Sequence, residues 1–232
     1  MLLEVNDIDT YYGIFQAIFQ VSFELEKGEV VCFLGRNGAG KTTTLSSVVG
    51  LQQANSGSIT FQGQEIRHRK PYQIARMGIG FVPEDRWVFS DLTVRENLEL
   101  GERKKSGKDH PLEKIYTLFP RLKSLEKQHA GTLSGGEQQM LTVGRTLMGS
   151  PVLILLDEPT AGLAPLIAQT LGSQISSLKA EGLTILLAEQ NAILAMNISD
   201  RSYVIDKGTI VYKGSVEQLK GEPEMMKSYL GV

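Results

Sequence analysis

The segment Gly35–Thr42 reads GRNGAGKT and directly follows the short apolar run Val30–Leu34. Such a run is typical of a buried strand, and the residues after Thr42 are expected to form a helix. A glycine-rich turn between a strand and a helix lets several backbone N–H groups converge on an anion, and the helix N-terminus favours its negative charge. The segment matches the phosphate-loop pattern G-x-x-x-x-G-K-[ST] in full. We therefore expect it to bind the phosphates of a nucleotide.

Each residue type in this loop has a distinct expected role. Lys41 would reach the β- and γ-phosphates, and the hydroxyl of Thr42 would bind Mg²⁺. The residues expected to bind the nucleotide here are Gly35, Asn37, Gly38, Ala39, Gly40, Lys41, Thr42 and Thr43.

A second apolar run, Leu153–Leu156, ends in two carboxylates, Asp157 and Glu158. In open α/β sheets ligands bind at the carboxyl ends of the strands, so these acids are expected beside the phosphate loop. Asp157 would join the Mg²⁺ shell. Glu158 would accept a proton from the attacking water. An apolar strand followed by acids is a weak signal alone, but paired with a phosphate loop it indicates a nucleotide-hydrolysing site.

The remaining pattern predicts an α/β fold. Thr184–Ala188 is a further apolar run, and Pro165–Glu181 has apolar residues at helical spacing. Apolar strands separated by helices favour a parallel sheet covered on both faces. The first 30 residues and the stretch 58–82 have glycine-punctuated short strands, which favours an antiparallel sheet.

Residues 86–150 have mainly helical signals. Thr93–Glu96 fits a capping box, and an apolar stripe at helical spacing starts at Leu112. The charged stretch Glu102–His110 is expected to be a loop. Two short helices, Ser215–Lys220 and Pro223–Leu230, are expected at the C-terminus.

We therefore predict one domain over residues 1–232 with a P-loop NTPase (RecA-like) core. Residues 1–85 and 151–232 would form this α/β core together with an N-terminal antiparallel β subdomain. Residues 86–150 would form an inserted α-helical subdomain.

Composition excludes several other classes of protein. Lys and Arg total 24 and Asp and Glu total 26, a net charge of −2 that disfavours general nucleic-acid binding. The single cysteine, Cys32, rules out a disulfide framework and is expected to fill apolar space. No apolar run approaches the length of about 18 residues needed to span a membrane. The three histidines, His68, His110 and His129, lack metal-ligand spacing and are expected on the surface.

The segment Leu133–Gln139 reads LSGGEQQ and predicts a second anion-binding helix start. Ser134 and Glu137 fit a capping box, and Gly135 and Gly136 leave the first backbone N–H groups accessible. In isolation this would be only a well-capped helix. In a chain that already has a phosphate loop, it makes sense if it serves the nucleotide of a different molecule.

Together these motifs resemble the ATP-binding subunits of ABC transporters, in that family's order and spacing over essentially the whole chain. The resemblance implies ATP and Mg²⁺ as ligands. It also implies that two such subunits sandwich ATP head to tail, the phosphate loop of one facing Ser134–Glu137 of the other. Tyr12 matches the family's aromatic residue that stacks on adenine; Tyr11 is the competing candidate, and a packed surface role for Tyr12 is the alternative.

Three departures from the family pattern narrow the resemblance. Glu84 stands where the family usually has a glutamine that touches Mg²⁺, and Gln190 replaces the usual switch histidine. The segment called the D-loop usually reads Ser-Ala-Leu-Asp in the family, and here Ala161–Ala164 reads AGLA. With these features the chain is similar to the LivF-type subunit of branched-chain or hydrophobic amino acid importers. A urea or amide importer subunit and a catalytically weak regulatory subunit are the alternatives. An ABC protein acting on nucleic acid or ribosomes is disfavoured by the charge and by the lack of a long insertion.

These departures have chemical consequences. Gln190 cannot change charge, although it can still position water or a phosphate oxygen. Glu84 can offer oxygen to Mg²⁺ but adds a negative charge, which favours dependence on the metal ion or protonation of the carboxyl group. We therefore expect tight MgATP binding and slow hydrolysis by the chain alone, with a sister subunit supplying the more active site.

The resemblance also implies partners and a location. These are a second ABC ATPase subunit, either a paralogue or a second copy, transmembrane permease subunits, and indirectly a substrate-binding protein. The chain would lie on the cytoplasmic face of the membrane, attached through protein contacts. Trp87 and Phe89 would suit docking of a permease helix, or they belong to the core of the helical subdomain.

Overall fold

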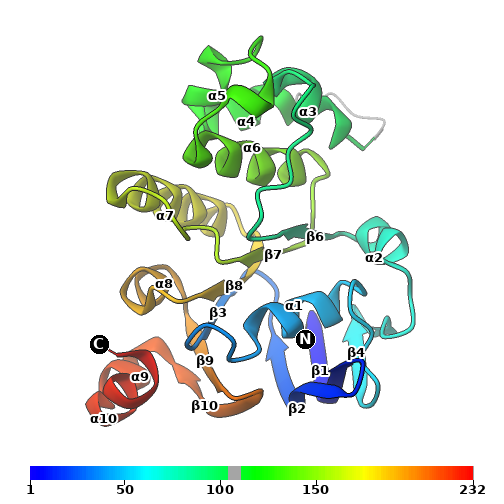
Figure 1. The fold of residues 1–232 in the computed structure, drawn as a ribbon, viewed down its shortest axis with the longest axis vertical. Coiled ribbons are helices and arrows are strands. Elements are labelled where there is room, and N and C mark those ends of the chain that lie inside the picture. The colour runs from blue at the N-terminus through cyan, green and yellow to red at the C-terminus, as the bar shows by residue number, and fades with distance from the viewer. Residues whose placement is uncertain (104–110, 232) are drawn as a thin grey trace.

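The computed structural model describes residues 1–103 and 111–231, and these form two sheets with helices around them (Figure 1). The four-stranded antiparallel sheet has the order β2-β1-β4-β5. Its strands are β1 (Leu3–Tyr12), β2 (Phe15–Leu25), β4 (Ser58–Phe61) and β5 (Gln64–Glu65). The six-stranded sheet has the order β10-β9-β3-β8-β7-β6. Its strands are β3 (Val30–Leu34), β6 (Ile79–Val82), β7 (Leu153–Asp157), β8 (Thr184–Glu189), β9 (Arg201–Asp206) and β10 (Thr209–Ser215).

The predicted parallel sheet is confirmed. Strand β8 pairs in parallel with β3 on one side and with β7 on the other, so that Ala188 lies beside both Phe33 and Asp157. Parallel strands carry their carboxyl ends to one edge of the sheet. The residues that follow β3, β7 and β8 therefore come together at that edge.

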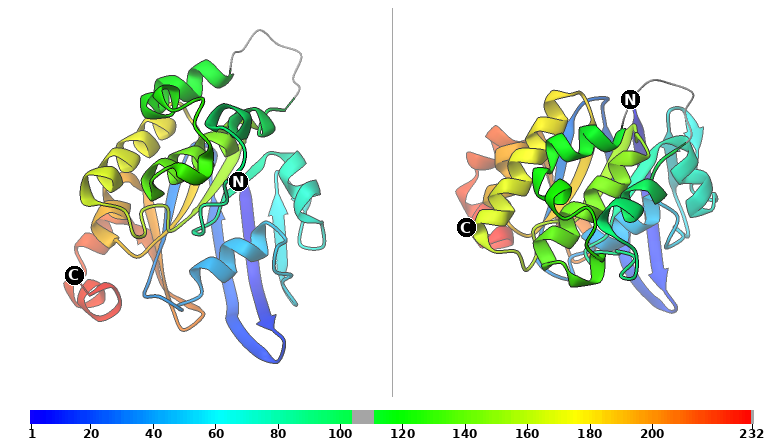
Figure 2. Two further views of the ribbon diagram at one scale, coloured as in Figure 1. Left: turned by 45° about the horizontal axis from the view of Figure 1, so that its top comes forward. Right: turned by 90° about the horizontal axis from the view of Figure 1, so that it is seen from above.

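Alternate residues of β3 enter two separate cores. Val30, Cys32 and Leu34 pack with residues of α7 (Pro165–Ala180) and α8 (Ala192–Ile198), whereas Val31 and Phe33 pack with α1 (Lys41–Val48) and the antiparallel sheet. Figure 2 shows these layers, with helices on both sides of the sheet. Burial on both faces explains why the central strands are continuous apolar runs.

One strand was assigned to the wrong sheet. The stretch 58–82 was expected to be antiparallel throughout, but β6 pairs in parallel with β7, Ile79 opposite Leu153 and Val82 opposite Leu156. The reason is helix α2 (Pro71–Met77), which carries the chain from one sheet to the other and ends at Gly78 in the left-handed conformation. In this short helix only Ile74 is buried, so it leaves almost no periodic apolar signal.

The helices agree with most of the sequence expectations. Helix α7 ends one residue before the expected Glu181, and capping boxes at Thr93 and Ser134 begin α3 and α6. The C-terminal segment forms α9, then a short α10 that continues as a π-helical turn over Met226–Leu230. The helices are α1 (Lys41–Val48), α2 (Pro71–Met77), α3 (Val94–Leu100), α4 (Pro111–Leu118), α5 (Pro120–Ser124), α6 (Gly135–Met148), α7 (Pro165–Ala180), α8 (Ala192–Ile198), α9 (Val216–Lys220), α10 (Pro223–Met225) and a 3₁₀ turn (Ala130–Thr132).

Helices α3 to α6 gather at one end of the molecule, away from the β1–β2 hairpin (Figure 1). The described part of residues 86–150 contains helices and no strand. The boundaries of a separate subdomain there stay a prediction. The expected charged loop, apart from Glu102 and Arg103, lies outside the described residues, and so does His110. His68 and His129 are exposed, and Cys32 is fully buried, as expected.

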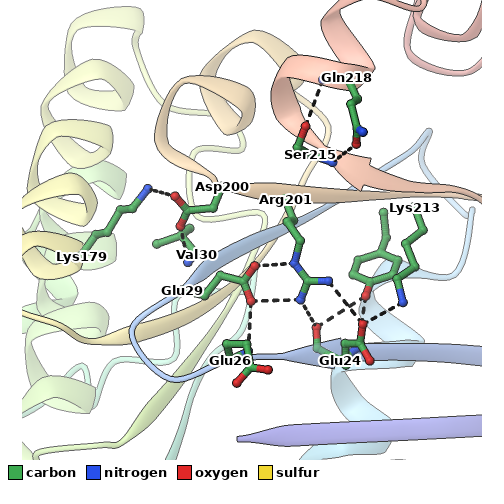
Figure 3. Close-up of polar contacts among 11 residues, drawn as sticks. Glu24, Glu26, Glu29, Val30, Lys179, Asp200, Arg201, Lys213, Ser215 and Gln218 are labelled. Atoms are coloured by element: carbon green, nitrogen blue, oxygen red, sulfur yellow. Dashed lines mark hydrogen bonds and ion pairs between the residues drawn. The ribbon is translucent and has the colours of Figure 1, made fainter. Parts of the chain in front are cut away.

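An ion-pair cluster joins the two sheets at the amino ends of β3 and β9 (Figure 3). Arg201 donates through Nη2 to Glu29 Oε2 at 3.0 Å and to the carbonyl oxygen of Glu24 at 2.9 Å, and its Nε also binds Glu29. Lys213 binds the Glu24 carboxylate at 2.8 Å. This cluster fixes β2 against β9 at the edge opposite to the carboxyl ends. Within the described ranges, no helix is long and apolar enough to cross a membrane.

Candidate nucleotide-binding site

The loop between β3 and α1 is built around two tightly packed glycines. A Cβ atom on Gly35 would collide with the carbonyl oxygen of Ile205, and one on Gly40 would lie 3.0 Å from Ile18 Cγ2. Gly40 also has a φ of +113° at the residue before α1. Any side chain at these two positions would displace the loop from β9 or β2. The glycines therefore fix the path that exposes the backbone N–H groups.

Lys41 lies across its own loop and is only 3% exposed. Its Nζ donates to the carbonyl oxygens of Gly35 at 2.8 Å and Arg36 at 3.2 Å. The same Nζ forms an ion pair with Glu158 Oε1 at 2.9 Å. The two residues are 117 positions apart in the chain (158 − 41), so the parallel sheet alone brings them together.

Thr42 and Asp157 meet beside this pair, with Thr42 Oγ1 donating to Asp157 Oδ1 at 3.1 Å. Asp157 is 1% exposed. Burial raises the pKa of Asp157 to about 6, and the nearby carboxylates of Glu158 and Glu84 add to this effect. A buried carboxylate with acidic neighbours is a site that a cation would stabilise.

A cavity of about 450 Å³ opens over the loop. Glu84 and Glu158 reach it from the segments after β6 and β7. The loop itself contributes Asn37, Gly38, Ala39, Gly40, Lys41, Thr42 and Thr43. The structure thus brings the predicted phosphate and metal residues to one place.

A second cavity, of about 1010 Å³, shares Asn37, Glu84 and Glu158 with the first. Gln190 lines it from the segment after β8, together with Thr160 and the D-loop residues 161–163. Gln190, which replaces the switch histidine, therefore lies at the same edge of the parallel sheet as Glu158. The signature residues Ser134–Glu137 are not among the described residues that line either cavity.

Glu189 had no predicted role in the sequence analysis. It is 2% exposed. Its Oε1 accepts from the backbone N–H of Thr160 at 3.1 Å and from Thr160 Oγ1 at 2.6 Å, and its Oε2 accepts from the N–H of Asn191 at 3.3 Å. Burial raises its pKa, and these hydrogen bonds oppose that effect. Glu189 thus ties the segment of Gln190 to Thr160, the residue directly before the D-loop.

The aromatic residue beside the phosphate loop is Phe19. Phe19 is 41% exposed and lines the cavity together with Gln16, Ala17 and Lys207. Tyr12 is 49% exposed and is absent from the described lining. Tyr11 is half-buried and donates its hydroxyl to Gln16 Oε1 at 2.8 Å.

Phe19 and Lys207 had no recognisable signal in the sequence. The β9–β10 turn brings them to the site, since Gly208 donates to Ala39 O and accepts from Phe19 N–H, both at 2.8 Å.

The signature segment begins α6 with the expected capping box. Ser134 N–H and Oγ both donate to Glu137 Oε2, at 2.9 and 2.8 Å. Arg121 binds the other carboxylate oxygen at 2.8 Å. Burial by itself would raise the pKa of Glu137, but the hydrogen bonds from Ser134 and Arg121 outweigh burial and lower that pKa. The carboxylate of Glu137 is thus engaged within its own helix, while Gly135 and Gly136 stay partly exposed.

The donor set at the loop fits a hard cation. Thr42, Asp157 and Glu84 offer hydroxyl and carboxylate oxygens, the ligand type that Mg²⁺ takes together with substrate phosphates. No cluster of three or more His, Cys, Asp or Glu residues suited to a metal occurs in the described residues. Because Mg²⁺ is usually bound through one or two carboxylates plus substrate phosphates, a polyphosphate would complete its shell here.

Comparisons with known proteins agree with this reading. The family described as ABC transporter matches residues 18–161, more than half of the chain. The high-affinity branched-chain amino acid transport ATP-binding protein BraG of Pseudomonas aeruginosa is 47% identical, over 99% of this chain and 100% of that protein. A probable branched-chain amino acid transport ATP-binding protein LivF of Archaeoglobus fulgidus is 34% identical, over 100% of this chain and 99% of that protein.

A solved ATP-binding cassette of an ABC transporter, in its ADP conformation, superposes with a TM-score of 0.82 at 30% identity and covers 97% of each chain. The relatives and this structure match the chain from end to end, and the family pattern spans both the phosphate loop and the acidic strand. This chain therefore belongs to the ABC transporter family, as an ATP-binding subunit.

Proposed function

We propose that this chain binds MgATP and hydrolyses it to power import through a membrane transporter. The observation that carries the proposal is the convergence of Lys41, Thr42, Asp157, Glu158 and Glu84 at the carboxyl edge of the parallel sheet. A phosphate loop, an acidic strand and a second carboxylate at one edge suit phosphoryl transfer to water.

Thr42, Asp157 and Glu84 would hold Mg²⁺. When bound, the ion supplies positive charge that offsets the charge on the phosphate oxygens. Lys41 would exchange its ion pair with Glu158 for a bond to the terminal phosphates, which frees the carboxylate of Glu158. Glu158 would then accept a proton from water, and Gln190 would orient that water without taking the proton.

The signature helix of the same chain does not take part in this site, because residues 134–137 line neither cavity in the described part of the chain. We propose that they act on the nucleotide of a second ABC subunit in a head-to-tail dimer. The partner would be a paralogue or a second copy. Polar N–H groups at a partly exposed helix start are suited to an anion that a partner delivers.

An apolar groove of about 560 Å³ supports attachment to permease subunits. Its lining includes Trp87, Phe89 and Leu100, which are 54, 53 and 58% exposed. Exposed aromatic residues beside a concave surface are typical of an interface for a helix. Trp87 is three residues from Glu84, so a permease helix bound at this groove would be linked to the nucleotide. It would place the chain on the cytoplasmic face of the membrane.

The proposed cargo is a branched-chain or other hydrophobic amino acid, by analogy with the two relatives named above. A substrate-binding protein and the permease would select it. Reconstitution with the permease and a binding protein tests this, using ATP-dependent uptake of labelled leucine and, in parallel, labelled urea. Uptake of leucine that requires intact Lys41 is the predicted result. Uptake of urea alone would contradict the amino acid assignment.

We further propose slow hydrolysis by the isolated chain and faster hydrolysis at the sister subunit's site. The Lys41–Glu158 ion pair and the glutamine at position 190 support this. Steady-state turnover of the assembled transporter should fall less after Glu158→Gln here than after the matching change in the sister. A larger fall from the change in this chain would overturn the asymmetry.

A further inference from the structure

Arg86 occupies the junction of three segments: the one that carries Glu84, the D-loop and the start of α6. Its Nη2 donates to the carbonyl oxygen of Ala161 in the D-loop at 2.8 Å. A Cβ atom on Gly162 would lie 3.4 Å from the same nitrogen, and one on Gly135 would collide with the guanidinium group. The flat guanidinium thus lies against two glycines, one in the D-loop and one at the start of α6.

The surrounding backbone is shaped to hold Arg86 there. Arg86 has a φ of +50°, uncommon for a residue with a side chain, and its carbonyl oxygen accepts from Val88 N–H at 2.7 Å. The start of α6 also lies directly against α7, because a Cβ on Gly136 would meet Ile167 Cγ2 at 2.7 Å. The Glu84 segment, the D-loop and the signature helix therefore form one packed unit.

Helix stability does not explain this placement. A cation near a helix N-terminus is disfavoured by the helix dipole, and α6 begins at Gly135. Arg86 forms no ion pair with an acid in the described residues that would compensate for this. A function that needs the three segments to move together would explain it.

We propose that Arg86 is a positioning residue that couples the Glu84 segment to the D-loop and to the start of the signature helix. Ala161 N–H donates to the carbonyl oxygen of Glu158 at 3.0 Å, so the D-loop is joined directly to the residue that contacts Lys41. Binding of a nucleotide at the phosphate loop is transmitted through Glu158, Ala161 and Arg86 to α6, the signature helix that serves the second subunit. This inference rests on the proposed function.

The chain provides its own reporter for this coupling. Trp87 is the only tryptophan, follows Arg86 directly and is exposed. The experiment titrates the isolated full chain with MgATP, records Trp87 emission, and measures nucleotide affinity separately by calorimetry. The variants are Arg86→Ala and Arg86→Lys. Arg95→Ala is the matched control, because Arg95 is exposed on α3 and forms its ion pair with Glu99 on the same helix.

In the wild type we expect MgATP to change Trp87 emission. Arg86→Ala should lose most of that amplitude while its affinity for MgATP stays within about twofold. In the assembled transporter the same variant should lower kcat about tenfold, equivalent to about 1.4 kcal/mol, with little change in KM. Arg86→Lys should be intermediate, because lysine can donate to Ala161 but cannot lie flat between the glycines.

The outcomes separate the inference from the proposed function. Failure of the wild-type chain to bind MgATP would overturn both. Binding by the wild type with no change in Trp87 emission overturns the coupling alone. Wild-type amplitude and kcat in Arg86→Ala also overturn the coupling, as does a parallel loss of stability and affinity in both Arg86 variants, which would indicate a merely structural role.

Discussion

The ammonium group of Lys41 lies 2.9 Å from the carboxylate of Glu158, although each is the candidate for a different task at the same phosphate. Lysine is suited to the terminal phosphates and glutamate to the attacking water. While they bind each other, neither is available to the substrate. If both act on the nucleotide as proposed, its binding has to exchange this ion pair for new contacts, which supports the proposal of slow turnover by the chain alone.

Asp157 is expected to destabilise the nucleotide-free chain at neutral pH. Because burial raises its pKa to about 6, the native state holds this proton more tightly than the unfolded chain does. Its contribution to stability is present below about pH 4 and is lost as the pH rises through about 6. Asp157→Asn should therefore raise the free energy of unfolding at pH 7 by about 2–3 kcal/mol, and the gain should vanish near pH 4.

Urea unfolding of both chains at several pH values between 4 and 7 measures this difference. Asp91→Asn, a change at an exposed aspartate that is not among the described residues lining the phosphate cavity, is the control and should have no such pH dependence. An Asp157→Asn chain less stable than the wild type at pH 7 contradicts the account.

The adenine platform can be assigned by comparing two aromatic residues. Stacking of a base on an aromatic ring is worth about 1–3 kcal/mol, so Tyr12→Ala should weaken ATP binding by about tenfold. Binding of inorganic triphosphate should be unchanged. Phe19→Ala, at the ring that lines the phosphate cavity, is the matched comparison. If only Phe19→Ala weakens ATP relative to triphosphate, the base stacks on Phe19 and the assignment to Tyr12 is wrong.

Trp87 should matter for assembly rather than for folding. It is more than half exposed, so Trp87→Ala should change the free energy of unfolding by less than about 1 kcal/mol. Loss of an aromatic anchor at an interface typically costs about 2 kcal/mol or more, so co-purification with the permease should fall sharply. Tyr72→Ala, at an aromatic residue of similar exposure on α2, should leave assembly intact. A misfolded Trp87→Ala chain would instead place Trp87 in the subdomain core.

The cluster around Arg201 should contribute to stability without touching the site. Arg201→Ala leaves the mostly buried carboxylate of Glu29 without its charged partner and should cost about 2–3 kcal/mol in urea unfolding. Lys213→Ala removes an exposed partner of Glu24 and should cost less than about 1 kcal/mol. Nucleotide affinity measured under native conditions should be the same in both variants. Equal costs in unfolding would show that the Arg201–Glu29 pair adds nothing beyond a surface contact.

Local sequence signals were sufficient to predict the candidate site residues at the carboxyl edge of the parallel sheet. The phosphate loop and the acidic strand are each encoded in a few consecutive residues, and the parallel pairing of β3, β7 and β8 follows from their apolar runs. The two capping boxes were recognisable for the same reason, since Thr93 and Ser134 contact residues three positions away.

Long-range pairings carried no such signal. Strand β6 has four residues, and its parallel pairing with β7 joins Ile79 to Leu153, 74 positions away in the chain (153 − 79). Phe19 and Lys207 reach the phosphate cavity because the β9–β10 turn packs against β2. Arg86 and Ala161 are 75 residues apart, and their contact depends on how the helices are placed around the sheet.

The most direct measurement is phosphate release from ATP by the purified chain, wild type against Glu158→Gln, together with nucleotide affinity. The account predicts that both bind MgATP with similar affinity, that the wild type hydrolyses it slowly, and that the variant is slower by about 100-fold or more. Equal rates of phosphate release from the two chains would contradict the assignment of Glu158 as the residue that accepts the proton from water.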